Sequence, residues 1–120
     1  MAHQIIWCDI PVVDLDRAIR FYSAVIGAEV KKHDVPGMSI GLFPDADTHV
    51  SACLFVSEKD KPSDHGPLIY LNCSGRLDAA VAAVEANGGR ILQPKQQIGG
   101  YGFRAVILDS EGNRMALHSN

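Results

Sequence analysis

The chain has 120 residues, of which 47% are hydrophobic and 21% charged, a composition that predicts one globular domain with an apolar core. Its net charge of −3 provides no basic surface, which argues against nucleic acid or an anionic membrane surface as a partner. No apolar run approaches the roughly 20 residues that span a bilayer.

The first half of the chain predicts a strand, a helix and three further strands. QIIWCDIPVV (4–13) is rich in β-branched residues and alternates partly, as a strand does. DLDRAIRFYSAVIG (14–27) carries apolar residues on one helical face, with Asp14 as the N-cap and Gly27 as the stop. Three short β-like runs follow, at 28–35, 39–44 and 49–56.

The second half repeats the first. The polar segment SEKDKPSDHGP (57–67) is expected to be a linker, and after it come a strand, a second helix that stops at Gly88-Gly89, and three more strands. RLDAAVAAVEANGG (76–89) is identical to DLDRAIRFYSAVIG at five of fourteen positions. We therefore predict an α+β fold in which two βαβββ modules, 1–57 and 67–120, pair around a cleft in a single domain, 1–120.

The segments DLDRAIRFYSAVIGAEV, LDAAVAAVEANGGRIL and LDSEGNRMALH resemble the vicinal oxygen chelate superfamily. This superfamily includes glyoxalase I, bleomycin-resistance proteins and extradiol dioxygenases. Its last segment usually contains an Asp-Pro-Asp-Gly-like turn, in which this chain has Ser110 and Glu111 in place of Pro-Asp. The resemblance implies the paired-module fold but does not choose a function, because many chemistries occur on this scaffold.

Metal-using members of that superfamily take one ligand from the first strand and one from the last strand of each module, typically His, Gln or Glu. By resemblance these positions fall on Trp7, within Val50–Leu54, on Leu68 or Ile69, and on Ala116. None of these positions holds a carboxylate or an imidazole. We therefore expect no metal site and no cofactor.

Strand alternation predicts which side chains line the cleft. In the first strand, one face is expected to pack under the helix and the other to face the cleft; the packed set is Ile6, Cys8, Ile10 and Val12. In the second module the packed set is Ile69, Leu71 and Cys73. The predicted ligand-binding residues on the opposite faces, including the last strand, are Trp7, Asp9, Tyr70, Asn72 and His118. The alternative is that a partner subunit buries part of this surface.

The leading functional interpretation is a metal-independent small-molecule binding protein similar to the bleomycin-resistance branch. By that resemblance, a homodimer shelters an aromatic or cationic ligand, with Trp7 and Tyr70 as aromatic walls and Asp9 as the counter-charge. The alternative is a glyoxalase-type lyase or isomerase that acts on a small oxygenated substrate. It requires an unrecognised metal site or a metal-free acid–base pair, for which Asp9 and His118 are the candidates; a structural hydrogen bond is the other interpretation of that pair. A purely structural domain is a third interpretation.

The cysteines and the first residues favour a reducing compartment. Cys8, Cys53 and Cys73 are odd in number and far apart, so we expect free thiols and no disulfide framework. The segment MAHQIIWCDIPVVD lacks a cationic start followed by a long apolar core, so no secretory signal is expected. Together these features predict a cytoplasmic protein.

Overall fold

Each half of the chain folds into one helix and one four-stranded sheet, in a computed structural model that describes residues 3–120. The first module contains β1 (Trp7–Val12), α1 (Leu15–Ile26), β2 (Lys31–Val35), β3 (Met38–Leu42) and β4 (Ser51–Val56). The second contains β5 (Ile69–Asn72), α2 (Leu77–Ala86), β6 (Arg90–Gln97), the short 3-10 helix η1 (Gly99–Tyr101), β7 (Phe103–Leu108) and β8 (Arg114–Ser119). The predicted α+β fold of two βαβββ modules is confirmed.

Helix α1 forms where its local sequence predicts it. The Asp14 carboxylate accepts a hydrogen bond from the backbone N–H of Arg17 at 3.0 Å, which satisfies one of the free donors at the helix start. Gly27 ends the helix with a φ of 72°, a left-handed conformation that glycine adopts without strain. Neither described helix is long and apolar enough to cross a membrane.

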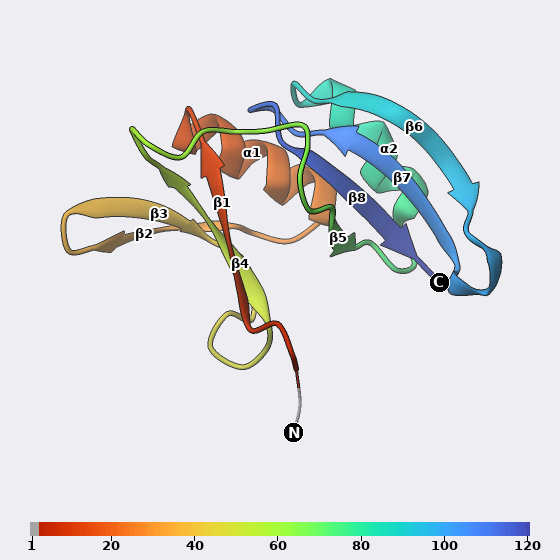
Figure 1. The fold of residues 1–120 in the computed structure, drawn as a ribbon, viewed down its shortest axis with the longest axis horizontal. Helices are drawn as coiled ribbons and strands as arrows, with labels where there is room; N and C mark the ends of the chain where they lie inside the picture. The colour runs from red at the N-terminus through yellow and green to blue at the C-terminus, as the bar shows by residue number, and fades with distance from the viewer. Residues whose placement is uncertain (1–2) are drawn as a thin grey trace.

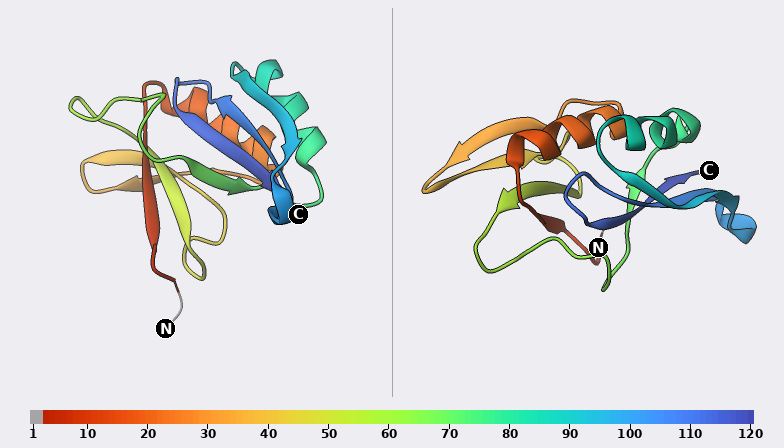
Figure 2. Two further views of the ribbon diagram at one scale, coloured as in Figure 1. Left: turned by 45° about the vertical axis from the view of Figure 1, so that its right-hand side comes forward. Right: turned by 90° about the horizontal axis from the view of Figure 1, so that it is seen from above.

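The two sheets share one core with the helices. Strand order is β1-β4-β3-β2 in the first sheet and β5-β8-β7-β6 in the second. The right-hand view of Figure 2 shows α1 and α2 side by side, with both sheets beneath them, and in Figure 1 the same helices lie behind the strands. Buried side chains from both sheets, among them Ile10, Leu54, Ile107 and Leu117, join the helices in a single apolar cluster. The face of each sheet opposite the helices, called here its open face, points away from this core.

Strands β1 and β5 lie at the edges of their sheets, and the described residues form two separate sheets rather than one continuous sheet. Ile10 and Val12 of β1 are buried, as predicted, but the prediction that Ile6 packs under the helix is wrong. Ile6 is 76% exposed because it precedes β1, and the neighbouring strand β4 begins opposite Trp7, at Ser51. The chain therefore presents an uncovered apolar segment next to an edge strand.

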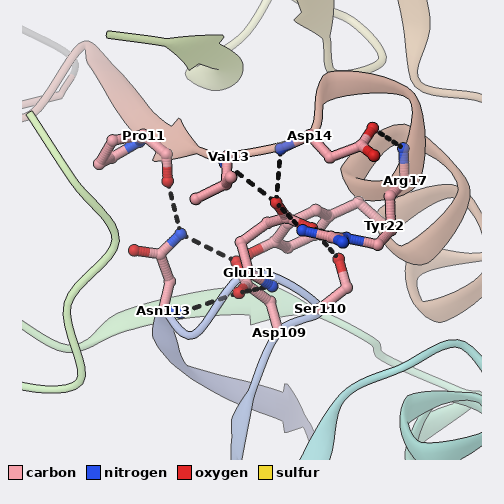
Figure 3. Close-up of polar contacts among 9 residues, drawn as sticks. All are labelled: Pro11, Val13, Asp14, Arg17, Tyr22, Asp109, Ser110, Glu111 and Asn113. Carbon is pink, nitrogen blue, oxygen red and sulfur yellow. Dashed lines mark hydrogen bonds and ion pairs between the residues drawn. The ribbon is translucent and has the colours of Figure 1, made fainter. Parts of the chain in front are cut away.

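The turn between β7 and β8 attaches the second module to the first. The Glu111 carboxylate accepts hydrogen bonds from the backbone N–H groups of Val13 and Asp14, at 2.9 and 2.8 Å, and from the Arg17 guanidinium. Figure 3 shows this carboxylate beneath the first turn of α1. The residue that departs from the superfamily's usual turn thus joins the two modules.

A buried hydrogen-bond network lies directly behind Glu111 (Figure 3). The Asp109 carboxylate accepts from the Tyr22 hydroxyl, and the Asn113 amide bridges Asp109 and the carbonyl of Pro11, at 3.0 and 2.8 Å. Burial and the adjacent Asp109 raise the pKa of Tyr22 well above its ordinary value, so Tyr22 remains a hydroxyl donor. These contacts fix the final turn against both β1 and α1.

Candidate functional site

The open face of the first sheet carries a small cluster of Trp7, Asp9 and Cys53, called here the Trp7 cluster. The parallel register of β1 and β4 places Cys53 directly beside Asp9. Oδ1 of Asp9 accepts hydrogen bonds from Nε1 of Trp7 at 2.9 Å and from Sγ of Cys53 at 3.3 Å. The indole is 37% exposed, so an aromatic ring held by a carboxylate faces outward.

Cys53 is a protonated thiol in this setting. Burial raises its pKa to about 11, with further contributions from the hydrogen bond to Asp9 and from the charge of Asp9. The thiolate is the reactive and metal-binding form of cysteine. Cys53 therefore supplies neither a nucleophile nor a thiolate ligand near neutral pH.

The open face of the second sheet carries a second cluster, Tyr70, Arg104 and His118, called here the Tyr70 cluster. The rings of Tyr70 and His118 have centroids 6.0 Å apart, and the Arg104 guanidinium lies 5.8 Å from the Tyr70 ring centroid. Nη1 of Arg104 donates a hydrogen bond to the Tyr70 hydroxyl. The Tyr70 ring is partly exposed, and its neighbours Ile69 and Leu71 pack against the core as predicted.

Arg104 was missed by reasoning from the sequence. Its strand, FRAVIL, gives no clear polar–apolar alternation, because Val106 on the same face as Arg104 is also buried. The register of β7 with β8 places Arg104 on the open face, since Arg104 pairs with His118. The sequence did contain one signal that could have found Arg104. Two strands joined by a hairpin turn lie side by side, so the strand that contains Arg104 had to pair with the final strand.

The other predicted residues have hydrogen bonds of their own. Oδ1 of Asn72 accepts from the backbone N–H of Ser74 at 3.0 Å, which shapes the turn after β5. His118 donates from Nε2 to the carbonyl of Tyr101 at 2.6 Å. A carbonyl only accepts, so Nε2 carries the hydrogen and Nδ1 is the nitrogen able to take up a proton. Asp9 and His118 thus bond to different residues, and no hydrogen bond joins the two side chains within the described chain.

The positions that hold a metal in metal-using members of the superfamily do not fit one here. Ser51 lies beside Trp7 in the first sheet, and Tyr70 lies beside Ala116 in the second. Ile69 packs against the core, which leaves Leu68 as the better match of the two alternatives. Residues 3–120 contain no group of three or more His, Cys, Asp or Glu residues that could hold a metal ion. The donor set lacks the carboxylates and imidazoles such a site requires.

Two hollows of the described surface lie away from the predicted ligand-binding residues. One lies beside the start of α2, and its lining includes Arg76, Asp78, Lys95 and Phe103. The other lies between β1, β5 and the linker, and its lining includes Lys61, Ser63, His65 and Arg114. None of Trp7, Asp9, Tyr70, Asn72 and His118 lines either hollow.

Two βαβββ modules, each with one helix and one four-stranded sheet, define an α+β scaffold of paired modules. The chain belongs to the Glyoxalase/Bleomycin resistance protein/Dioxygenase superfamily, whose family model matches residues 4–117. A comparison with curated proteins gives no match.

Solved structures share the fold at low sequence identity. A glyoxalase/bleomycin resistance protein from Albidiferax ferrireducens is 17% identical with a TM-score of 0.73, covering 98% of this chain and 99% of that one. A mutant of the fosfomycin resistance protein FosX from Listeria monocytogenes, complexed with Mn(II) and 1S,2S-dihydroxypropylphosphonic acid, is 13% identical with a TM-score of 0.72, covering 100% and 94%. A glyoxalase I mutant from Zea mays is 21% identical with a TM-score of 0.68, covering 95% and 46%. These identities show the fold alone.

Proposed function

We propose that this protein binds a small organic molecule on the open faces of its sheets without a metal ion. The proposal rests on one observation, which is that two features occur together on those faces. Exposed aromatic rings, Trp7 and Tyr70, stand beside polar groups, while the superfamily's metal positions offer no carboxylate or imidazole. Small-ligand sites combine aromatic surface with a few well-placed polar groups in this way.

The Trp7 cluster supplies a surface and an acceptor. The indole ring offers a flat apolar surface, and its hydrogen bond to Asp9 fixes its orientation. Oδ1 of Asp9 is used by Trp7 and Cys53, whereas Oδ2 makes no hydrogen bond within residues 3–120. Oδ2 is therefore available to a hydrogen-bond donor on the ligand.

A second copy of the chain completes the site in this proposal. The open faces are not enclosed in one chain, and the edge strand β1 is preceded by Ile5 and Ile6, which are 72% and 76% exposed. Val50 and Val56 at the ends of the adjacent β4 are also exposed. Unpaired edge strands with apolar surroundings favour association, and a homodimer would cover this surface.

The alternative is a glyoxalase-type lyase or isomerase acting on a small oxygenated substrate. One observation favours it: Nδ1 of His118 makes no hydrogen bond within the described residues, so this nitrogen is available to act on a substrate. In this alternative Asp9 and His118 act as separate groups on the substrate, because they do not bond to each other in one chain.

The test is a ligand screen by thermal shift in the presence of EDTA, followed by isothermal titration calorimetry, because variants of Trp7 lose the only tryptophan and its fluorescence. Trp7→Ala should weaken the affinity for a hit by roughly tenfold or more, as expected for an aromatic anchor, and leave the melting temperature within a few degrees. Trp7→Phe, the matched control, should retain much of the affinity. Binding that EDTA abolishes, or a severe loss of melting temperature with unchanged affinity in Trp7→Ala, contradicts the proposal.

A further inference from the structure

The four strands of the second sheet carry positive charge and no carboxylate. Their residues include Arg90, Lys95, Arg104 and Arg114, and none is Asp or Glu. The first sheet, by contrast, contains both Asp9 and Asp34. The cations of the second sheet therefore have no carboxylate partner within their own strands. Lys95 pairs instead with Asp78 of α2 at 3.1 Å.

Arg104 is held in place by a side-chain hydroxyl and not by an anion. Its Nη1 donates to the Tyr70 hydroxyl, and no ion pair joins it to a carboxylate within residues 3–120. Its Nε, like that of Arg114, is buried and has no acceptor in that part of the chain, so this feature does not distinguish the two arginines.

We propose that the Tyr70 cluster binds the oxyanion of a ligand, a carboxylate or a phosphate group. Nη1 of Arg104 is used by Tyr70 and Nε is buried, so Nη2 is the donor left for a ligand, and a charged N–H donor of this kind binds an oxyanion strongly. Tyr70 fixes the guanidinium, while His118 lies directly beside Arg104 in the strand register. The inference rests on the proposed function, to which it adds the charge of the ligand.

Arg114 is not part of this site, although it lies on the same face. It is four residues from His118 along β8, which is about 13 Å at the usual rise of a strand. Its Nη2 donates to the carbonyl of Gly66 at 2.8 Å, so this side chain attaches the linker to the sheet. A general positive field would involve both arginines, whereas an oxyanion site built on Arg104 requires Arg104 alone.

The probes are benzoate, benzamide and benzylamine, which present the same ring with a negative, neutral and positive group. Isothermal titration calorimetry should show benzoate binding about tenfold or more tightly than benzamide, and benzylamine binding no better than benzamide. Arg104→Gln should remove this preference, and Arg104→Lys should retain it only in part, because lysine lacks the planar guanidinium that Tyr70 holds in place. Arg90→Gln, with the same loss of charge on exposed β6, should leave it intact.

Competition against benzoate then separates the two oxyanions. If inorganic phosphate displaces benzoate at a lower concentration than acetate does, the ligand's oxyanion is a phosphate group. If acetate displaces benzoate at the lower concentration, the oxyanion is a carboxylate. If benzoate and benzamide bind with equal affinity, and Trp7→Ala weakens the binding of both, the oxyanion site is overturned but the proposed function is kept. Equal losses in Arg104→Gln and Arg90→Gln, with melting temperatures unchanged, would also overturn it, as would no binding of benzoate or phosphate at ~10 mM, which detects even millimolar affinity.

Discussion

Arg17 and Glu111 connect the first helix to the last β-hairpin through an ion pair with 2.7 Å between Nε and Oε2. The Glu111 side chain has no exposed surface, whereas that of Arg17 is 46% exposed. The same carboxylate accepts the backbone N–H groups of Val13 and Asp14, so its charge lies at the positive end of α1. One side chain of the second module thus stabilises the start of the first module's helix.

Glu111→Gln should destabilise the protein by about 2 kcal/mol, because a buried carboxylate with several donors is replaced by an amide whose NH2 group opposes Arg17. Urea unfolding monitored by circular dichroism measures the change. Asp16→Asn is the matched control: its carboxylate pairs with Lys32 at 3.2 Å, but both side chains are more than half exposed. That substitution should cost only about 0.3 kcal/mol, and equal losses in the two variants would contradict the role given to Glu111.

The stability of the protein should fall as the pH drops from 4.5 towards 2. Burial alone raises the pKa of Glu111, but hydrogen bonds from Arg17, Asp14, Ser110 and Val13 outweigh it and lower the pKa from 4.5 to about 2. The unfolded chain therefore binds this proton first, so the contribution of Glu111 is complete above pH 4.5 and is lost as the pH falls through about 2. Unfolding free energies across this range should depend less on pH in Glu111→Gln than in the wild type, and parallel curves would exclude this linkage.

Tyr22→Phe should lower the free energy of unfolding by about 1–2 kcal/mol, since it removes a donor to the buried carboxylate of Asp109. The ring itself is fully buried and is retained by phenylalanine, so the loss reports the hydroxyl. Tyr101→Phe is the control, because Tyr101 is 82% exposed and its side chain makes no hydrogen bond among the described residues. Thermal unfolding of both variants gives the comparison, and an unchanged Tyr22→Phe protein would show that water replaces the hydroxyl.

The sequence patterns correctly predicted those features of the fold that depend on interactions between residues close together in the chain. The N-cap Asp14, the stop at Gly27 and the alternation along β1 and β5 depend on neighbours within a few residues, and the structure has them. Ile6 was placed wrongly because cover for a strand residue depends on where the partner strand begins, which no local pattern records.

Long-range pairs could not be predicted in the same way. Glu111 meets Arg17 across 94 positions of the chain, and Arg104 meets Tyr70 across 34. Such contacts depend on the positions of hairpin turns and on the registers of the sheets. The periodicity of apolar residues along the chain does not determine either of them. The sequence showed only that the superfamily's turn had been altered at Ser110 and Glu111, without showing what the change contacts.

The protein should be a homodimer in solution. Ile6→Lys adds a charge next to the edge strand β1 at a residue that is 76% exposed in one chain, so it should weaken dimerisation without lowering the stability of the chain. Leu92→Lys makes the same change on β6, the outer strand of the second sheet, and should leave the dimer intact. Sedimentation equilibrium should give about 26 kDa for the wild type, twice the 13.0 kDa chain mass. A wild-type mass of one chain at micromolar concentration would refute this prediction.

Elemental analysis of protein purified without chelators and dialysed against metal-free buffer tests metal-independent binding most directly. Trp7, Leu68 and Ala116 have no donor atom for a metal, and residues 3–120 contain no alternative group of ligands. A catalytic metal in a protein usually has about three protein ligands. We predict zinc, manganese, nickel and iron well below one equivalent per chain, with ligand binding retained. One equivalent of any of these metals per chain, lost together with ligand binding when it is removed, would contradict the account.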